Sequence, residues 1–101
     1  MAFSIVFNEE KNQLLKATQK VSFKDVLKAL HSQQLLADIG HPSKYYPHQR
    51  MYVVKINKYA YAVPYVFNSQ KHIIFLKTLY PSRVLTKKYL KGGKHEKDKK
   101  I

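Results

Sequence analysis

Apolar residues near the start of the chain first alternate as in a strand and then follow a helical spacing. Residues 3–7 alternate apolar and small side chains, which predicts a short strand. Asn8 can cap the helix that follows, with Glu9 and Glu10 in its first turn, where the helix dipole favours anions. We expect this first helix to end near Lys20.

A second helix is predicted from Ser22 to about His31. Ser22 is its cap, and Asp25 can reach back toward the Ser22 amide in the manner of a capping box. Apolar residues then recur at spacings of three and four, which places them on one helix face: Phe23, Val26, Leu27 and Leu30. The two helices therefore follow each other with only a short connection.

The chain between residues 32 and 49 has a mixed pattern. Residues 35–39 fit either a short strand or a turn of helix. Pro42 and Pro47 push the residues before them out of the helical region, which predicts loop structure at residues 40–43 and 46–48. We expect this segment to lead into a more regular part of the chain.

Three strands are predicted after this loop, at residues 50–56, 59–67 and 72–79. Asn57-Lys58 fits a two-residue hairpin turn, because asparagine tolerates positive φ. Pro64 has no amide proton to donate, so it predicts an edge or bulge position in the second strand. A short helix is predicted at 83–90, and Gly92-Gly93 ends it.

These elements predict an α+β fold, with an antiparallel sheet, two N-terminal helices packed on one face and a short C-terminal helix. We expect one domain over residues 1–91 and a charged, flexible tail over residues 92–101. The small side chains of the second strand, Ala60 and Ala62, suit close packing under the helices. Strand alternation then puts a mixed basic and aromatic set on the open face: Lys55, Tyr61, Tyr65, Phe75 and Lys77.

Charge is distributed very unevenly along this chain. Its formal net charge is +13, and from Ile39 to His95 it has no Asp or Glu but eleven Lys or Arg and all eight Tyr. Cations attract phosphates, and aromatic rings offer faces on which unpaired bases stack. Nucleic acid is therefore the leading partner class, ahead of an acidic protein and an anionic membrane. A site in this region would lack carboxylates to hold Mg²⁺ or to act as a general base.

Several other kinds of protein are disfavoured by the sequence. The chain has no cysteine, lacks a signal-peptide pattern and contains no long apolar run, which together predict a cytoplasmic protein. His41 and His48 with Asp38 lack the close spacing of metal ligands, so no metal is predicted. No Gly-rich phosphate loop is present, and no cofactor is predicted.

Three stretches of the chain resemble the BrnT-like branch of the RelE/ParE toxin superfamily. They are residues 7–12 (FNEEKN), residues 21–26 (VSFKDV) and residues 76–88 (LKTLYPSRVLTKK). The family commonly has Trp-Asp where this chain has Phe7-Asn8. The resemblance implies a RelE-like fold and the toxin of a type II toxin–antitoxin pair, with an acidic, DNA-binding antitoxin as partner.

The same resemblance implies a metal-independent endoribonuclease that cuts mRNA, in many members on the ribosome. In that reaction the ribose 2′-OH attacks the adjacent phosphorus and leaves a cyclic phosphate and a 5′-OH. The predicted catalytic residues are Arg83, which matches the family's arginine, together with Lys77, Lys55, His72 and Tyr80. The predicted RNA-binding residues are Arg50, Tyr61, Tyr65, Lys87 and Lys88.

Two other functions fit the same sequence. A non-catalytic RNA- or ribosome-binding module would use the same basic, aromatic surface without any proton transfer. A gyrase-directed toxin of the ParE type would share the implied fold and act through protein contacts. Loss of RNA cutting in an Arg83→Ala variant separates the enzyme from the binding module, and topoisomerase inhibition with intact RNA indicates the ParE type.

Overall fold

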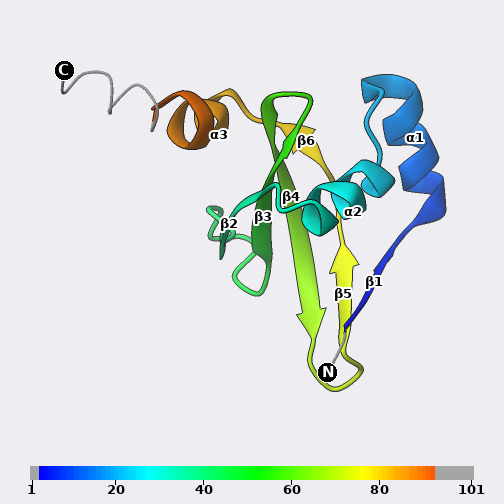
Figure 1. The fold of residues 1–101 in the computed structure, drawn as a ribbon. Coiled ribbons are helices and arrows are strands. Elements are labelled where there is room, and N and C mark those ends of the chain that lie inside the picture. Colours follow the sequence, from blue (N-terminus) through cyan, green and yellow to red (C-terminus); the bar gives the residue numbers. More distant parts are fainter. Residues whose placement is uncertain (1–2, 93–101) are drawn as a thin grey trace.

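Six strands form one sheet in the computed structural model, which describes residues 3–92 (Figure 1). Along the sheet the order is β1-β5-β4-β3-β2, and the short β6 also pairs with β4. The strands are β1 (Ser4–Phe7), β2 (Leu35–Gly40), β3 (Arg50–Ile56), β4 (Tyr59–Asn68), β5 (Ile73–Leu76) and β6 (Tyr80–Pro81). The α+β prediction is thereby confirmed, and residues 35–39 belong to a strand rather than to a helical turn.

The prediction of an all-antiparallel sheet is wrong, because β1 pairs with β5 in parallel, from Ser4 opposite Ile73 to Phe7 opposite Leu76. Parallel neighbours require a long connection between them. Here both helices and strands β2 to β4 intervene, so β1 is free to run alongside β5. The other strand pairs are antiparallel, and the sheet is mixed.

Both predicted N-terminal helices are present, α1 (Glu9–Gln19) and α2 (Phe23–His31). Asn8 caps α1 by accepting from the Lys11 amide at 2.8 Å, and the Asp25 carboxylate accepts from the Ser22 amide at 2.8 Å. The two helices are joined by buried Asn12, whose side-chain oxygen accepts from the Phe23 amide at 2.8 Å. A side-chain hydrogen bond thus fixes the start of α2 against α1.

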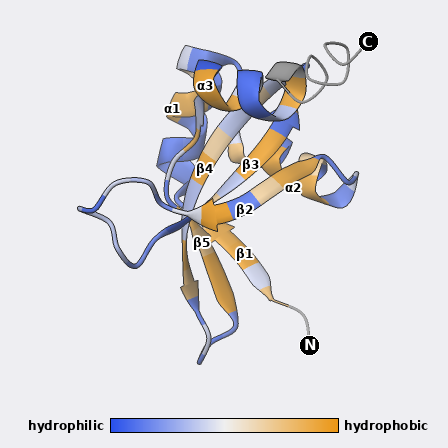
Figure 2. Ribbon diagram, turned by 90° about the vertical axis from the view of Figure 1, so that its left-hand side faces the viewer, coloured by the Kyte–Doolittle hydropathy of each residue, from blue (hydrophilic) through white to orange (hydrophobic). Residues whose placement is uncertain are grey.

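The main core lies between α2 and one face of the sheet. Phe23 and Val26 of α2 are fully buried against side chains that alternate along the strands: Tyr52, Val54, Ile56, Val63, Tyr65 and Leu76. Leu15 of α1 joins the same cluster. Figure 2 shows α2 on one side of the sheet, with the loop between β2 and β3 projecting on the other.

The predicted assignment of sheet faces is wrong for two residues, because Tyr61 and Tyr65 face the α2 core. Lys55, Phe75 and Lys77 belong to the opposite face, as strand alternation and register require. The aromatic and branched side chains fill the α2 core. The small residues instead allow close approach of the C-terminal helical segment.

Ala60 shows this close approach directly. Its amide donates to the Thr86 hydroxyl at 2.9 Å, and its carbonyl accepts from the Ser82 amide at 3.0 Å. The segment that approaches consists of α3 (Arg83–Thr86) and a π-helical continuation, η1 (Lys87–Gly92). A helical stretch at residues 83–90 is thus confirmed, and residues 93–101, which include most of the predicted tail, lie outside the described residues.

Local backbone geometry confirms the predicted hairpin and locates Pro64. Asn57 and Lys58 both have positive φ, 54° and 67°, as a two-residue primed turn requires. Pro64 lies in β4, which is central, so the edge alternative is wrong. The bulge alternative fits, because Pro64 faces the interruption between β5 and β6. No helix within residues 3–92 is long and apolar enough to cross a membrane.

Candidate functional site

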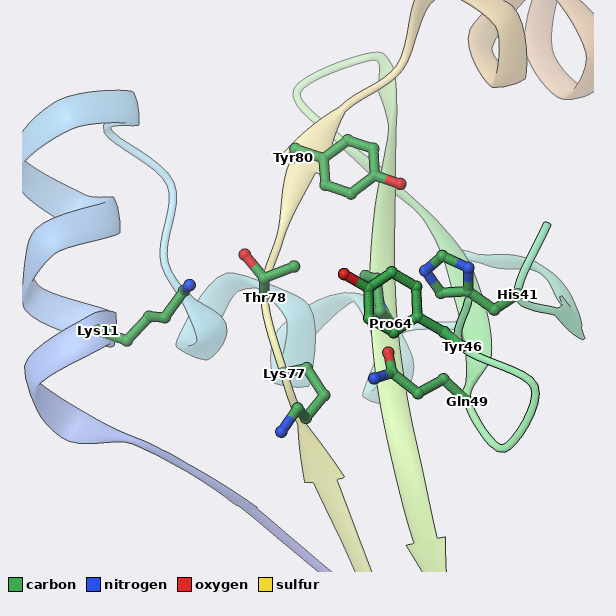
Figure 3. Close-up of a pocket in the computed structure, with 8 residues that line it drawn as sticks. All are labelled: Lys11, His41, Tyr46, Gln49, Pro64, Lys77, Thr78 and Tyr80. Atoms are coloured by element: carbon green, nitrogen blue, oxygen red, sulfur yellow. The ribbon is translucent and has the colours of Figure 1, made fainter. Parts of the chain in front are cut away.

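A pocket of about 420 Å³ opens on the sheet face opposite α2, within the size range of about 300–1,000 Å³ that is common for ligand sites. We call it the lysine pocket (Figure 3). It combines residues from α1, the β2–β3 loop, β4, the β5–β6 connection and β6. Its lining consists of Lys11, His41, Tyr46, Gln49, Pro64, Lys77, Thr78 and Tyr80.

The break between β5 and β6 builds one wall of the lysine pocket. Lys77 donates its amide to the Pro64 carbonyl at 2.8 Å, but Pro64 has no amide proton to offer in return. The regular ladder ends here, and buried Leu79 holds the irregular segment against the core. Lys77 and Thr78 therefore line the open side of the sheet in place of a continuous strand.

The loop of residues 41–49 builds the opposite wall. The His41 amide donates to the Gln49 carbonyl at 3.1 Å, and the Gln49 amide donates to the Tyr46 carbonyl at 3.1 Å. The rings of His41 and Tyr46 pack with their centroids 4.9 Å apart. His41 Nδ1 accepts from the Ser43 amide at 3.1 Å, which favours the tautomer that carries its proton on Nε2.

The electrostatic character of the lysine pocket is set by Lys11 and Lys77, since no carboxylate is among its lining residues. Lys77 Nζ also lies 5.2 Å from the centre of the Phe75 ring. A neighbouring groove shares Lys11 and Lys77 and includes one acid, Glu10. The pocket itself is a cationic hollow with hydroxyl, amide and imidazole groups around it, which suits an anionic ligand that also hydrogen-bonds.

Two of the five predicted catalytic residues, Lys77 and Tyr80, line the lysine pocket. The Tyr80 hydroxyl lies 3.9 Å from Met51 Sδ. The other three do not line it: Arg83 is exposed at the start of α3, Lys55 is half-buried in β3, and His72 is exposed beside β5. His72 has a positive φ of 56°, and its ring packs edge-on against Phe3 at 5.3 Å.

None of the predicted RNA-binding residues lines the lysine pocket. Tyr65 is 5% exposed and stacks on Tyr52 with ring centroids 4.1 Å apart, so its ring is not available to a base. Tyr61 is half-buried against the α2 core. Lys87 and Lys88 are exposed on η1.

The Arg50 guanidinium is paired with Asp38. Its Nε donates to Asp38 Oδ1 at 3.2 Å, and its terminal nitrogen donates to the Asp38 carbonyl at 2.9 Å. The Tyr65 hydroxyl donates to the same Asp38 oxygen at 2.8 Å. We call Asp38, Arg50, Tyr52 and Tyr65 the Asp38 cluster. Burial, together with the hydrogen bond to Asp38, raises the pKa of Tyr65 and keeps its hydroxyl a neutral donor.

Six lining residues were not among the predicted site residues: Lys11, His41, Tyr46, Gln49, Pro64 and Thr78. Lys11 and Thr78 occur in stretches that carry the family resemblance, but their types gave no signal of their own. His41, Tyr46 and Gln49 lie in the loop where the sequence pattern was weakest. The concentration of aromatic and imidazole side chains at residues 41–48 was the available signal.

Comparisons of the chain with protein-family models, with curated proteins and with solved structures give no match. Within residues 3–92, no three His, Cys, Asp or Glu side chains gather as potential metal ligands.

Proposed function

We propose that this chain is the toxin of a type II toxin–antitoxin pair, a RelE-like, BrnT-like protein that cuts mRNA without a metal ion. The observation that carries the proposal is the lysine pocket. It unites Lys77 and Tyr80, both predicted catalytic residues, with a second cation and an imidazole, and no carboxylate lines it. That combination supports phosphate binding and proton transfer.

The proposed reaction is an internal transfer at phosphorus. The ribose 2′ oxygen bonds to the adjacent phosphorus while its proton passes to a base, and the bond from phosphorus to the 5′ oxygen breaks. The leaving 5′ oxygen takes up a proton, so the products are a 2′,3′-cyclic phosphate and a 5′-OH. The step needs a proton acceptor, a proton donor and positive charge beside the phosphorane.

The pocket has a group for each need. Lys11 and Lys77 stabilise the negative phosphorane oxygens. The leaving 5′ oxygen takes its proton from the ammonium group of Lys77, which becomes a neutral amine. His41 Nδ1 accepts from the Ser43 amide, so the ring keeps its proton on Nε2 and donates a hydrogen bond from there to the phosphorane. The Tyr80 hydroxyl relays the 2′ proton: its oxygen accepts that proton while it passes its own proton to solvent water, so the phenol is restored. Arg83 is the second residue after β6 and does not line the pocket. It stays a predicted phosphate ligand.

The arrangement of elements is consistent with the family resemblance. A strand, two helices, an antiparallel run of strands and a short basic helix occur in the expected order. The implied partner is an acidic antitoxin, because a formal charge of +13 calls for an anionic protein that covers the cationic surface. The proposed substrate is mRNA that is being translated, and the cut occurs on the ribosome, as in many members of the family.

Primer extension on cellular mRNA after brief induction tests the proposal. Lys77→Met keeps an apolar stem beside Phe75 and removes the charge, whereas Lys28→Met removes an exposed lysine of α2, away from the pocket. We expect discrete new 5′ ends with wild type and Lys28→Met, and their loss with Lys77→Met. Arg83→Ala, examined in parallel, tests the arginine that the family resemblance indicates.

Two results contradict the proposal. If induction of the wild-type protein arrests growth but leaves mRNA intact, the target is not RNA and is another molecule, such as gyrase. Intact mRNA without arrest favours a non-catalytic RNA-binding module. New 5′ ends that persist at full strength in Lys77→Met would remove the lysine pocket from the reaction while leaving a ribonuclease.

A further inference from the structure

The lysine pocket has two chemically different sides (Figure 3). Lys11 and Lys77 approach from α1 and the β5–β6 connection and supply positive charge. His41, Tyr46 and Gln49 come from the β2–β3 loop and supply ring faces and one amide. A phosphate requires only the first side. The second side therefore calls for a ligand that is more than a phosphate.

The loop side presents groups that the protein itself leaves free. Among the hydrogen bonds within residues 3–92, none involves the Gln49 side-chain amide, the Tyr46 hydroxyl or His41 Nε2. The backbone that carries them is nevertheless fixed, because the loop closes on itself through the His41–Gln49 and Gln49–Tyr46 hydrogen bonds. Free polar groups on a fixed backbone are the usual arrangement of a recognition site.

Tyr46 is suited to stacking. Its side chain is 49% exposed, and its ring is supported from one side by His41 at 4.9 Å. A supported ring with an open face can receive a flat partner at little loss of side-chain entropy. By contrast, the tyrosines of the sheet that were predicted to stack on RNA are turned into the α2 core. The loop therefore takes over the base-stacking function that the sequence placed on β4.

We propose that the loop side of the lysine pocket binds the base of a purine ribonucleotide, preferring adenine, whose phosphate lies against Lys11 and Lys77. In this arrangement the base stacks on Tyr46 and its edge pairs with the Gln49 amide. The inference deepens the proposed ribonuclease function and rests on it for the biological substrate. It identifies Gln49 as the residue that sets specificity.

Adenine is preferred on hydrogen-bonding grounds. One glutamine amide offers a donor and an acceptor side by side, which match the ring nitrogen and the amino group of adenine. Cytosine's amino group is commonly read by a carboxylate, and no carboxylate lines the pocket. Guanine is commonly read by a cation, but both pocket cations are directed to the phosphate. A purine also covers more of the Tyr46 ring than a pyrimidine does.

Nuclear magnetic resonance titration of the ¹⁵N-labelled full chain tests this inference without any cleavage. The probes are 3′-AMP, 3′-UMP and ribose 5-phosphate. We expect 3′-AMP to bind roughly fivefold or more tightly than 3′-UMP, the range that one good paired base contact provides. Amide shifts should concentrate in residues 41–49 and 77–80.

Variants separate the two sides of the pocket. Gln49→Leu should bring the affinities for 3′-AMP and 3′-UMP within about twofold of each other and leave ribose 5-phosphate binding unchanged. Lys77→Met should weaken all three probes alike. Gln70→Leu, an exposed glutamine after β4, is the matched control and should bind as wild type does.

Equal affinity for 3′-AMP and 3′-UMP in the wild type overturns the base-reading inference, as does a preference that Gln49→Leu leaves intact. This outcome is distinct from failure of the proposed function. Adenine preference together with uncut mRNA would refute the ribonuclease and keep the nucleotide site. Cut mRNA with no base preference would keep the ribonuclease and refute the role of Gln49.

Discussion

Two polar clusters lie on opposite faces of this sheet and share strand β4. The Asp38 cluster lies on the α2 side, and its carboxylate, guanidinium and tyrosine hydroxyl bind one another. The lysine pocket lies on the other side, and its cations have no carboxylate among the lining residues. Residues adjacent in the sequence belong to different clusters: Gln49 and Pro64 line the pocket, and the residues that follow them, Arg50 and Tyr65, belong to the Asp38 cluster.

The difference lies in where the acids are. Asp38 is the last acid before the acid-free stretch, and β2 pairs with β3 so that Asp38 stands opposite Tyr52. It neutralises Arg50, the first cation of β3. Lys77 lies on the other face, out of reach of that carboxylate. A high count of cations alone thus does not distinguish the two clusters: Arg50 is paired with Asp38, whereas no carboxylate lines the lysine pocket.

Placing an acid in the lysine pocket should have the largest effect. Lys77→Glu reverses one of the two pocket charges, so we expect RNA affinity and any cleavage to fall by at least about 100-fold. The free energy of unfolding should stay within about 0.5 kcal/mol of wild type, because Lys77 is exposed. Fluorescence anisotropy with single-stranded RNA and urea denaturation measure the two quantities.

Lys28→Glu makes the same charge change at an exposed position of α2 and is the control. It should lower RNA affinity by no more than the general loss of net positive charge requires. Similar losses in the two variants would show that RNA follows overall charge and not the pocket.

Removing the acid of the Asp38 cluster should have the opposite effect, lowering the free energy of unfolding more than the RNA affinity. Asp38→Ala leaves the buried Tyr65 hydroxyl without its acceptor, and we expect a loss of roughly 1–3 kcal/mol in the free energy of unfolding. Asp38→Asn keeps an acceptor oxygen and should lose less. Urea denaturation of both variants measures the change, and an unaltered midpoint for Asp38→Ala would show that the cluster is not a stabilising contact.

Most of the fold could be predicted from the sequence because the signals are local. The caps at Asn8 and Ser22 and the turn at Asn57-Lys58 depend on residues next to one another, and each is present. The parallel pairing of β1 with β5 depends on contacts between distant segments. Periodicity along one strand carries no information on which neighbour that strand pairs with.

The face of the sheet on which each side chain lies was harder to predict than the strands themselves. Alternation divides β4 into two sets but does not say which set meets which helix. Small residues were correctly associated with close helix packing, but the helix is α3, through Thr86, and not α2. Of the predicted catalytic residues, Lys77 and Tyr80 line the candidate pocket, and their role stays a prediction. The loop residues could not be predicted, since the 41–49 loop takes its geometry from hydrogen bonds between its own residues, which no sequence pattern indicates.

Salt dependence offers a finer separation of the two clusters. Lys77→Met should reduce the slope of log affinity against log salt by about 0.7, as expected when one contact to a single-stranded phosphate is lost. Arg50→Met should leave the slope nearly unchanged, because Arg50 already pairs with Asp38. Anisotropy titrations between low and moderate salt measure both slopes. A matching reduction for Arg50→Met would restore the predicted RNA contact of Arg50.

The smallest expected effect is a change in stability at alkaline pH. Burial first, and then the hydrogen bond to Asp38, raises the pKa of Tyr65 above its ordinary value near 10. As pH rises, the unfolded chain loses this proton before the folded protein does, so the contribution is complete below pH 10 and declines above it. Burial also raises the pKa of Tyr52, which acts in the same direction. Tyr65→Phe should therefore reduce, but not abolish, the decline, by about half a kcal/mol or less at pH 10.5 given solvent screening. Urea denaturation at pH 8 and pH 10.5 measures the decline in the free energy of unfolding for each protein. Equal declines in the wild type and Tyr65→Phe would show that the pKa of Tyr65 is the same in the folded and unfolded states.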